Sequence, residues 1–112
     1  MRERVTLWYR VRDLDSARAW YVDALGFEET YVEPEGAWVK VERDGTTIAL
    51  AQGEPESGGP VAHVDVSDVK AEADRLRERG VDVGVVLELH GQIRLLQITD
   101  PDGNRLELGQ EL

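Results

Sequence analysis

Alternating hydrophobic and polar residues mark most of the strands that the chain is expected to form. Between residues 4 and 11 the odd positions are hydrophobic or aromatic, while Thr6, Trp8 and Arg10 face the other way. This period of two is typical of a strand with one buried face. By the same criterion and by the turn residues between them, strands are expected at 4–11, 27–32, 37–42, 46–51, 61–66, 81–87, 92–99 and 105–108.

Two stretches with helical spacing interrupt these strands. Each begins after an aspartate that can cap a helix, Asp13 or Asp68, and each ends at a glycine, Gly26 or Gly80. Aspartate at the first position and glycine just past the last are the usual signals for the two ends of a helix. Helices are therefore expected at 14–25 and 69–79.

The order of these elements occurs twice along the chain. Residues 11–14 and 66–69 carry the same Val-x-Asp signal 55 residues apart, and Asp-Gly begins both 44–50 and 102–108, which lie 58 residues apart. A repeated order at a nearly constant offset indicates an internal duplication. We expect one domain, residues 1–112, built of repeat units 1–52 and 61–112 that are joined by the breaker-rich linker 53–60.

Alternation also assigns a second face to each sheet, here called the inner face. Each helix covers one face of its sheet, so the inner faces would line a cavity if the sheets curl. A sheet face that is open to water rarely carries two tryptophans, as Trp8 and Trp38 would be here. Their presence favours a ligand cavity over a surface covered by dimerisation alone. The expected inner residues are Thr6, Trp8, Arg10, Trp38, Lys40, Glu42, Thr47, Ala49, Ala51, Val61, His63, Asp65, Leu95, Gln97, Arg105 and Glu107.

Composition narrows the class of partner. The net charge of −10 would repel nucleic-acid phosphates and anionic lipids, and no apolar run approaches the roughly 20 residues that cross a bilayer. The chain has no cysteine, which rules out disulfides and thiolate metal ligands. Its first residues lack the apolar segment of a signal peptide. We expect a cytoplasmic protein without nucleic-acid or membrane partners.

The repeated units and several motifs together resemble the vicinal oxygen chelate superfamily, which includes glyoxalases, bleomycin resistance proteins and extradiol dioxygenases. The resemblance implies an α+β fold in which two βαβββ repeats form curved mixed sheets around a cavity, and it implies a homodimer. The motifs that carry it are Val11-x-Asp13-Leu14, Trp20-Tyr21, Leu25-Gly26-Phe27, Val66-x-Asp68 and the run Asp100-Pro-Asp-Gly-Asn-Arg-Leu-Glu-Leu108.

The same resemblance implies four inner positions that hold a divalent metal in the enzymes of the family. They fall on Thr6, Ala49, Val61 and Glu107, and only the last keeps a ligand side chain. One carboxylate cannot hold such an ion at useful affinity, so no cofactor is expected. The alternative is a divalent metal ion bound by His63 and Glu107 with a donor from elsewhere.

Two functions from different classes remain. The first is a metal-free binding protein that sequesters a drug or metabolite, with Trp8 and Trp38 stacking on a small-molecule ligand. The second is a glyoxalase-like lyase or isomerase, or a dioxygenase, with His63 as metal ligand or general base and Glu107 as metal ligand or proton shuttle. The expected ligand-binding residues are Trp8, Arg10, Trp38, His63, Asp65, Gln97, Arg105 and Glu107.

Purely structural roles are also possible for the same residues. Each inner carboxylate could instead form a cross-strand ion pair with an arginine. The cavity could also be filled by the protein's own tryptophans.

Overall fold

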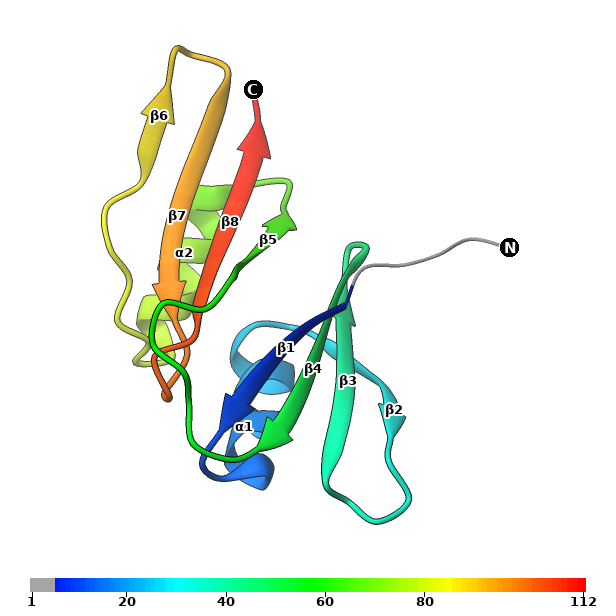
Figure 1. Cartoon of the computed structure of the whole chain (residues 1–112). Helices are drawn as coiled ribbons and strands as arrows, with labels where there is room; N and C mark the ends of the chain where they lie inside the picture. The colour runs from blue at the N-terminus through cyan, green and yellow to red at the C-terminus, as the bar shows by residue number, and fades with distance from the viewer. Residues whose placement is uncertain (1–5) are drawn as a thin grey trace.

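A computed structural model of the chain describes residues 6–112, so the expected strand residues before Thr6 lie outside the described part. Within it the chain forms two four-stranded sheets, ordered β1-β4-β3-β2 and β5-β8-β7-β6. Each sheet belongs to one βαβββ unit, which confirms the predicted α+β fold (Figure 1). The elements are β1 (Thr6–Val11), α1 (Leu14–Ala19), η1 (Trp20–Ala24), β2 (Glu28–Val32), β3 (Trp38–Arg43), β4 (Thr46–Gln52), β5 (Val61–Asp65), α2 (Val69–Glu78), β6 (Leu87–Leu89), β7 (Ile93–Thr99) and β8 (Arg105–Glu111).

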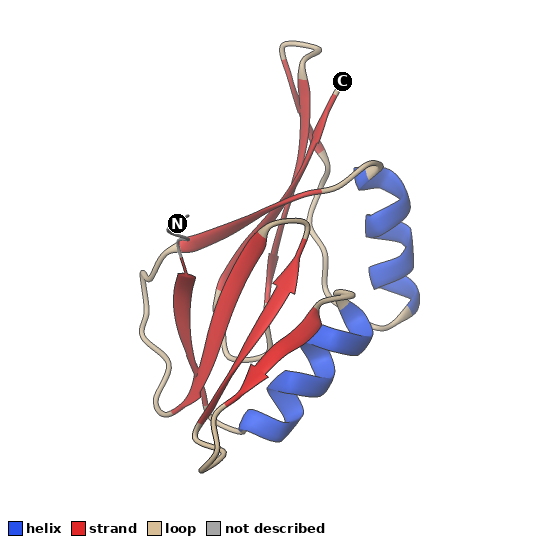
Figure 2. Cartoon of the chain, turned by 90° about the vertical axis from the view of Figure 1, so that its right-hand side faces the viewer, coloured by secondary structure: helices blue, strands red, loops and turns tan. Residues whose placement is uncertain are grey.

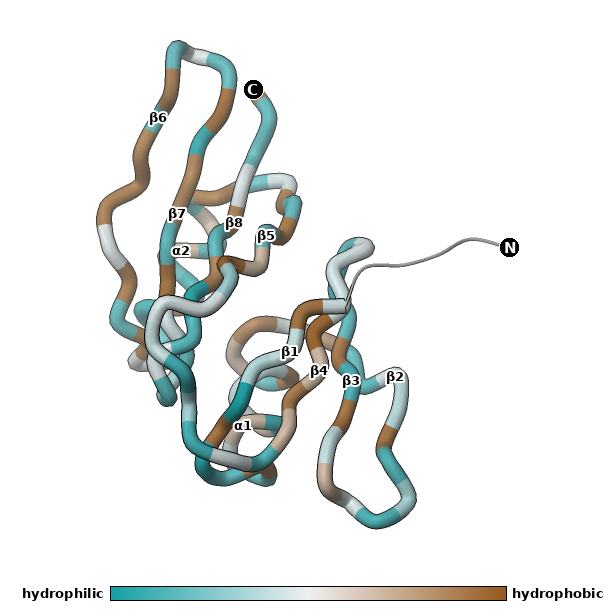
Figure 3. The backbone as a smooth tube through the Cα atoms, in the orientation of Figure 1, coloured by the Kyte–Doolittle hydropathy of each residue, from teal (hydrophilic) through white to brown (hydrophobic). Residues whose placement is uncertain are grey.

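Both sheets are mixed in the same way. In each unit the first strand pairs in parallel with the last, β1 with β4 and β5 with β8, and the remaining pairs are antiparallel. Hydrophobic and hydrophilic residues alternate along strands such as β3 (Figure 3). The residues that alternate with the expected inner residues are 0–9% exposed: Val39, Val41, Ile48, Leu50, Ala62, Val64, Val66, Leu96, Ile98, Leu106 and Leu108.

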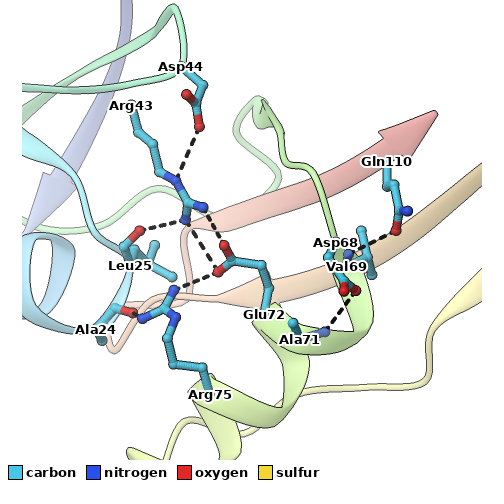
Figure 4. A network of polar contacts seen from close by, with 10 residues as sticks. All are labelled: Ala24, Leu25, Arg43, Asp44, Asp68, Val69, Ala71, Glu72, Arg75 and Gln110. Carbon is cyan, nitrogen blue, oxygen red and sulfur yellow. Dashed lines mark hydrogen bonds and ion pairs between the residues drawn. The ribbon is translucent and has the colours of Figure 1, made fainter.

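The two helices are capped by matching residues of the two units. Asp13 and Asp68 each accept a hydrogen bond from the backbone amide three residues later, at 3.1 and 3.0 Å, as predicted. Gln52 and Gln110, at the ends of β4 and β8, accept one from the first amide of the helix in the same unit, at 3.3 and 3.0 Å. Figure 4 shows the two capping contacts of the second unit, Asp68 with Ala71 and Gln110 with Val69. The similarity of the two units therefore extends to the capping side chains.

The first helix departs from the expected regular helix over 14–25. It is regular only as far as Ala19 and continues as the π-helical segment η1, in which the amide of Leu25 donates to the carbonyl of Trp20 at 3.3 Å. Tyr21 and Ala24, which are three residues apart, lie on the buried side of this segment, as they would in a regular helix. Periodicity alone does not reveal such a turn, because the hydrophobic spacing stays nearly helical.

The strand predicted at 81–87 is wrong in position, since β6 begins only at Leu87. Before it, Val83 makes one isolated bridge to Ile98. Val83 and Val86 pack against the core, but Val85 between them is exposed. The segment therefore runs along the lower half of β7 without becoming a regular strand (Figure 1).

Both helices lie on the same side of the two sheets (Figure 2), where one continuous hydrophobic core joins the two units. The inner faces of both sheets therefore lie on the opposite side. None of the helices in the described residues is both long enough and apolar enough to cross a membrane.

Side chains of one unit bind the backbone of the other. The hydroxyl of Tyr9 contacts the carbonyls of Pro60 and Arg105 and accepts a hydrogen bond from the amide of Ala62 at 2.9 Å. Burial raises the pKa of the Tyr9 phenol, so it stays protonated and able to donate. These contacts hold β1 of the first unit beside β5 of the second.

The turn between β7 and β8 forms a second contact between units. Its buried Asp100 accepts hydrogen bonds from the Tyr21 hydroxyl at 2.8 Å and from Nδ2 of Asn104 at 2.9 Å. The same Nδ2 donates to the carbonyl of Arg10 at 3.0 Å. Burial raises the pKa of Tyr21 well above its usual value, with the nearby Asp100 charge adding to the effect. The Asp-Pro-Asp-Gly-Asn motif thus acts as a structural connection between the units.

A third contact lies on the helix side, as the Arg43–Glu72–Arg75 network (Figure 4). Glu72 of α2 accepts hydrogen bonds from both arginines, at 2.5 Å each. The arginines also donate to the carbonyls of Leu25 and Ala24, each at 2.7 Å, which satisfies acceptors at the end of η1. Burial alone would raise the pKa of Glu72, but the two arginines outweigh it and hold that pKa below its usual value.

Candidate functional site

Aromatic side chains gather on the inner face of the first sheet. The ring centroids of Trp8 and Trp38 are 5.0 Å apart, and Tyr31 lies 5.1 Å from Trp38. We call these three residues the aromatic cluster. Beneath them, β4 carries Ala49 and Ala51, which pair with Trp8 and Trp38 in the strand register. Because alanine is small, the larger rings lean over β4 and meet.

The aromatic cluster covers part of the first sheet, but its own rings remain partly exposed to solvent. Ala49 beneath it is fully buried, yet the side chain of Trp8 is 52% exposed and Tyr31 is 44% exposed. The rings therefore keep free surface toward solvent. This arrangement argues against the interpretation that the protein's own tryptophans fill the whole site.

Sequence reasoning did not find Tyr31. The register between β2 and β3 shifts between Glu29 and Tyr31, which breaks the simple alternation along β2. The shift sets Tyr31 opposite Lys40, an inner residue, and so next to Trp38. A bulge of this kind leaves no reliable mark in a five-residue strand.

Two cations flank the aromatic cluster. Nζ of Lys40 lies 5.9 Å from the centroid of the Trp38 ring, within the range of a cation–π contact. Arg10, one of the expected ligand-binding residues, lies 3.5 Å from Glu56 of the linker, and both side chains are largely exposed. Glu56 and Arg10 together border a hollow beside Trp8.

The expected residues of the second sheet form a separate group. His63 on β5 contacts Glu107 on β8, with Nδ1 2.8 Å from Oε1, and Nε2 lies 3.2 Å from Oδ1 of Asp65. We call these three residues the His63 cluster. An ionised carboxylate only accepts hydrogen bonds, so a ring nitrogen of His63 that carries a proton donates it to the carboxylate that it faces.

A glycine makes room for the His63 ring. The ring lies directly over Gly109 of β8, where a Cβ atom would come within 2.5 Å of the imidazole Cε1. No ordinary side chain fits there without displacing the ring. Trp8 occupies the matching position in the first unit and lies above alanines, so a ring over a small residue occurs in both sheets.

The residues at the family's metal positions do not suit a divalent ion. Ala49 and Val61 offer no donor atom, and Oε1 of Glu107 is already bonded to His63. Nδ1 of His63 faces Glu107 and Nε2 faces Asp65, so the two carboxylates lie on different sides of the ring and cannot share one metal ion with a single ring nitrogen. Across residues 6–112 no group of three or more histidine, aspartate or glutamate side chains is placed to share a metal ion.

The remaining expected residues, Gln97 and Arg105, line a hollow of about 280 Å³ on the inner face of the second sheet. We call it the second-unit hollow. Its other lining residues are Val61, Asp82, Gly84, Ile98, Thr99 and Leu106. Asp82 is not among the expected inner residues, although it alternates with Val81 and Val83, which pack against the core.

The structure therefore brings the expected site residues together as two groups. Trp8, Trp38 and Arg10 lie on the first sheet, and the His63 cluster with the second-unit hollow lies on the second. Figure 1 shows the two sheets side by side with α1 and α2 behind them, so the sheet faces that the helices leave uncovered are turned toward the viewer.

Comparison with known proteins agrees with this architecture. TnmS3, described as an antibiotic binding protein from Streptomyces sp. CB03234, is 27% identical in sequence. The structural match covers 100% of this chain and 98% of the TnmS3 chain, with a TM-score of 0.80. An integron cassette protein from the mobile metagenome of Halifax Harbour sewage outfall has a TM-score of 0.83 over 98% of this chain and 99% of its own. At 18% identity, the second match supports the fold alone.

Among relatives of known activity, biphenyl-2,3-diol 1,2-dioxygenase 3 of Rhodococcus globerulus is 28% identical over 88% of this chain. The present chain spans only 58% of the length of that enzyme. Residues 4–108 match the sequence profile of the Glyoxalase/Bleomycin resistance protein/Dioxygenase superfamily. The profile thus covers both repeat units, and the chain belongs to this superfamily.

Proposed function

We propose that the protein is a single domain that binds a small aromatic drug or metabolite on its inner face without a metal ion and without catalysis. The observation that carries the proposal is the aromatic cluster, in which Trp8 and Tyr31 keep exposed ring surface beside Trp38. The 27% identical TnmS3, an antibiotic binding protein, supports it. Arg10, the His63 cluster, Gln97 and Arg105 would contact the polar parts of the ligand.

The exposed part of Trp8 sets the scale of the interaction. A buried aromatic side chain removes about 150–250 Å² from water, so covering the exposed half of Trp8 would remove roughly 100 Å². At about 25 cal/mol per Å² this is worth about 2.5 kcal/mol. Since about 1.4 kcal/mol corresponds to a tenfold change in Kd, losing the ring should weaken binding at least tenfold.

Bleomycin and riboflavin, which both contain planar rings, serve as probes. We expect at least one of them to quench the tryptophan fluorescence with saturation, and Trp8→Leu to weaken its binding at least tenfold in calorimetry. Trp20→Phe is the matched control, because Trp20 is the first residue of η1 and packs against the core, so this change should leave binding unchanged. Equal affinity of the wild type and the Trp8→Leu variant would refute the role of the aromatic cluster.

We also propose a homodimer in which a second copy of the chain covers the inner faces. Exposed hydrophobic residues lie on β6 at the edge of the second sheet, including Leu87 and Leu89. Sedimentation equilibrium should give twice the mass of the chain, and Leu87→Lys should shift the equilibrium toward monomers. Val22→Lys, on the exposed side of η1, should not; a wild-type monomer at all concentrations would contradict the proposal.

Catalysis is the second candidate, because the 2.8 Å contact between His63 and Glu107 could transfer a proton. The assay uses the methylglyoxal–glutathione adduct and biphenyl-2,3-diol, each with Mn²⁺, Fe²⁺, Ni²⁺ or Zn²⁺. We expect no turnover and no stabilisation by these ions in thermal unfolding. Turnover that is abolished by His63→Ala would overturn the binding proposal in favour of an enzyme.

A further inference from the structure

The second-unit hollow carries two opposite charges that do not neutralise each other. Asp82 and Arg105 both line it. Arg105 donates to the carbonyl of Gly59 at 2.8 Å, and within the described part of the chain the side chains of Asp82 and Thr99 form no hydrogen bond or ion pair. Hydrogen-bonding groups in the hollow therefore remain available for a ligand.

The strand register explains why these charges stay apart. The bridge between Val83 and Ile98 sets Asp82 opposite Thr99, and Thr99 pairs with Arg105 on β8. Neighbouring strands are about 4.8 Å apart, so the Cα atoms of Asp82 and Arg105 are separated by about 10 Å, with Thr99 between them. A carboxylate and a guanidinium thus flank the hollow from two sides.

The remaining walls describe the rest of the ligand. Val61, opposite Arg105 on β5, offers an exposed apolar side chain, and Gln97 adds an amide that can donate and accept. The volume of about 280 Å³ is slightly below the range of about 300–1,000 Å³ for pockets that hold drug-sized ligands. The hollow therefore suits a molecule of amino-acid size.

Charge selects among such molecules. The net charge of −10 disfavours a purely anionic ligand, and Arg105 disfavours a purely cationic one. A zwitterion avoids both penalties, because its ammonium group can meet Asp82 while its carboxylate meets Arg105. We propose that the second-unit hollow binds a small zwitterion, an α-amino acid or an amino-acid-like part of a larger ligand, with its apolar group against Val61.

This inference rests on the proposed function, since it assigns ligand chemistry to one part of the same inner face. The probes are L-leucine, 3-methylbutylamine, which lacks its carboxylate, and 4-methylpentanoate, which lacks its ammonium group. We expect calorimetry to show L-leucine binding at least tenfold more tightly than either analogue. In Asp82→Asn the affinity for L-leucine should fall to that of 4-methylpentanoate, and in Arg105→Gln to that of 3-methylbutylamine.

The control variants make the same charge changes elsewhere. Asp74→Asn alters an exposed ion pair with Arg77 on α2, and Arg79→Gln alters the exposed end of that helix, so both should keep the wild-type preference. The proposal is overturned if L-leucine binds no better than its analogues, or if its preference survives in both Asp82→Asn and Arg105→Gln.

Bleomycin binding in the same variants separates this inference from the proposed function. If the aromatic probe depends on Trp8 while L-leucine shows no preference, the zwitterion site is refuted and the aromatic site stands. If L-leucine binding depends on Asp82 and Arg105 while Trp8→Leu changes nothing for bleomycin or riboflavin, the zwitterion site stands and the aromatic site is refuted.

Discussion

Replacement of Asp100 by alanine should be among the single substitutions that destabilise the fold most. Its carboxylate is buried and accepts four hydrogen bonds: from the Tyr21 hydroxyl at 2.8 Å, from the amides of Asp102 and Asn104 at 2.9 Å each, and from Nδ2 of Asn104 at 2.9 Å. Asp100→Ala would leave all four donors without this acceptor. Because Tyr21 belongs to the first unit, the change also weakens the contact between units.

The magnitude follows from the donors. A hydrogen bond to a charged group contributes about 1.5–3 kcal/mol, so four independent losses would total about 6–12 kcal/mol. The turn is partly exposed, and water can replace some of the bonds to its backbone amides. We therefore expect Asp100→Ala to lower the free energy of unfolding by about 3–5 kcal/mol, the usual cost of breaking a buried charged contact. Tyr21→Phe removes one donor and should cost about 1.5–3 kcal/mol.

Urea unfolding followed by circular dichroism, at one protein concentration, measures these losses and their coupling. In the Asp100→Ala background, Tyr21→Phe should cost little, because the hydroxyl has already lost its acceptor. The control Asp102→Ala removes a carboxylate that accepts from the backbone amide and the guanidinium of Arg12, at 3.2 and 3.3 Å, and should cost about 1–2 kcal/mol. If Tyr21→Phe costs the same in both backgrounds, or Asp100→Ala costs no more than Asp102→Ala, the reasoning is refuted.

Two further predictions concern pH and packing. The pKa of Glu72 is lower in the folded state than its usual 4.5, so its stabilisation is complete above that value and lost as the pH falls through the folded pKa. Acid unfolding of Glu72→Gln should accordingly show a shallower loss of stability below about pH 4.5 than the wild type, and identical slopes would contradict this. Gly109→Ala should displace the ring of His63 and break its bond to Glu107, seen as changed imidazole shifts in NMR spectra. Gly59→Ala, where a Cβ has no close neighbour, should leave those shifts unchanged.

The sequence was informative where a feature depends on local pattern. The alternation along single strands located Trp8, Trp38 and the pair His63–Glu107 on the inner faces, and the Asp-Gly turns and helix caps revealed the two units. These features depend on neighbours within a few residues or on a repeat. They can therefore be predicted without knowledge of the tertiary structure.

The features that were missed depend on irregular backbone or distant partners. Tyr31 reaches the aromatic cluster through a register shift in β2. Asp82 alternates with two core valines, but its place opposite Thr99 in the second-unit hollow depends on a bridge to β7 that the sequence does not indicate. The contact between Tyr21 and Asp100 joins residues 79 positions apart. The motif that contains Asp100 was recognised as a turn, but its role between units required the packed structure.

The contacts of Tyr9, Asp100 and Glu72 between the two units make the covalent link between them largely dispensable. A single cut at Ser57, an exposed residue of the linker, would sever no strand and none of these three contacts. The severed halves should remain a stoichiometric pair, and separately produced halves should find each other in solution by fragment complementation. Such behaviour would fit an origin in which two identical short chains associated before they became one.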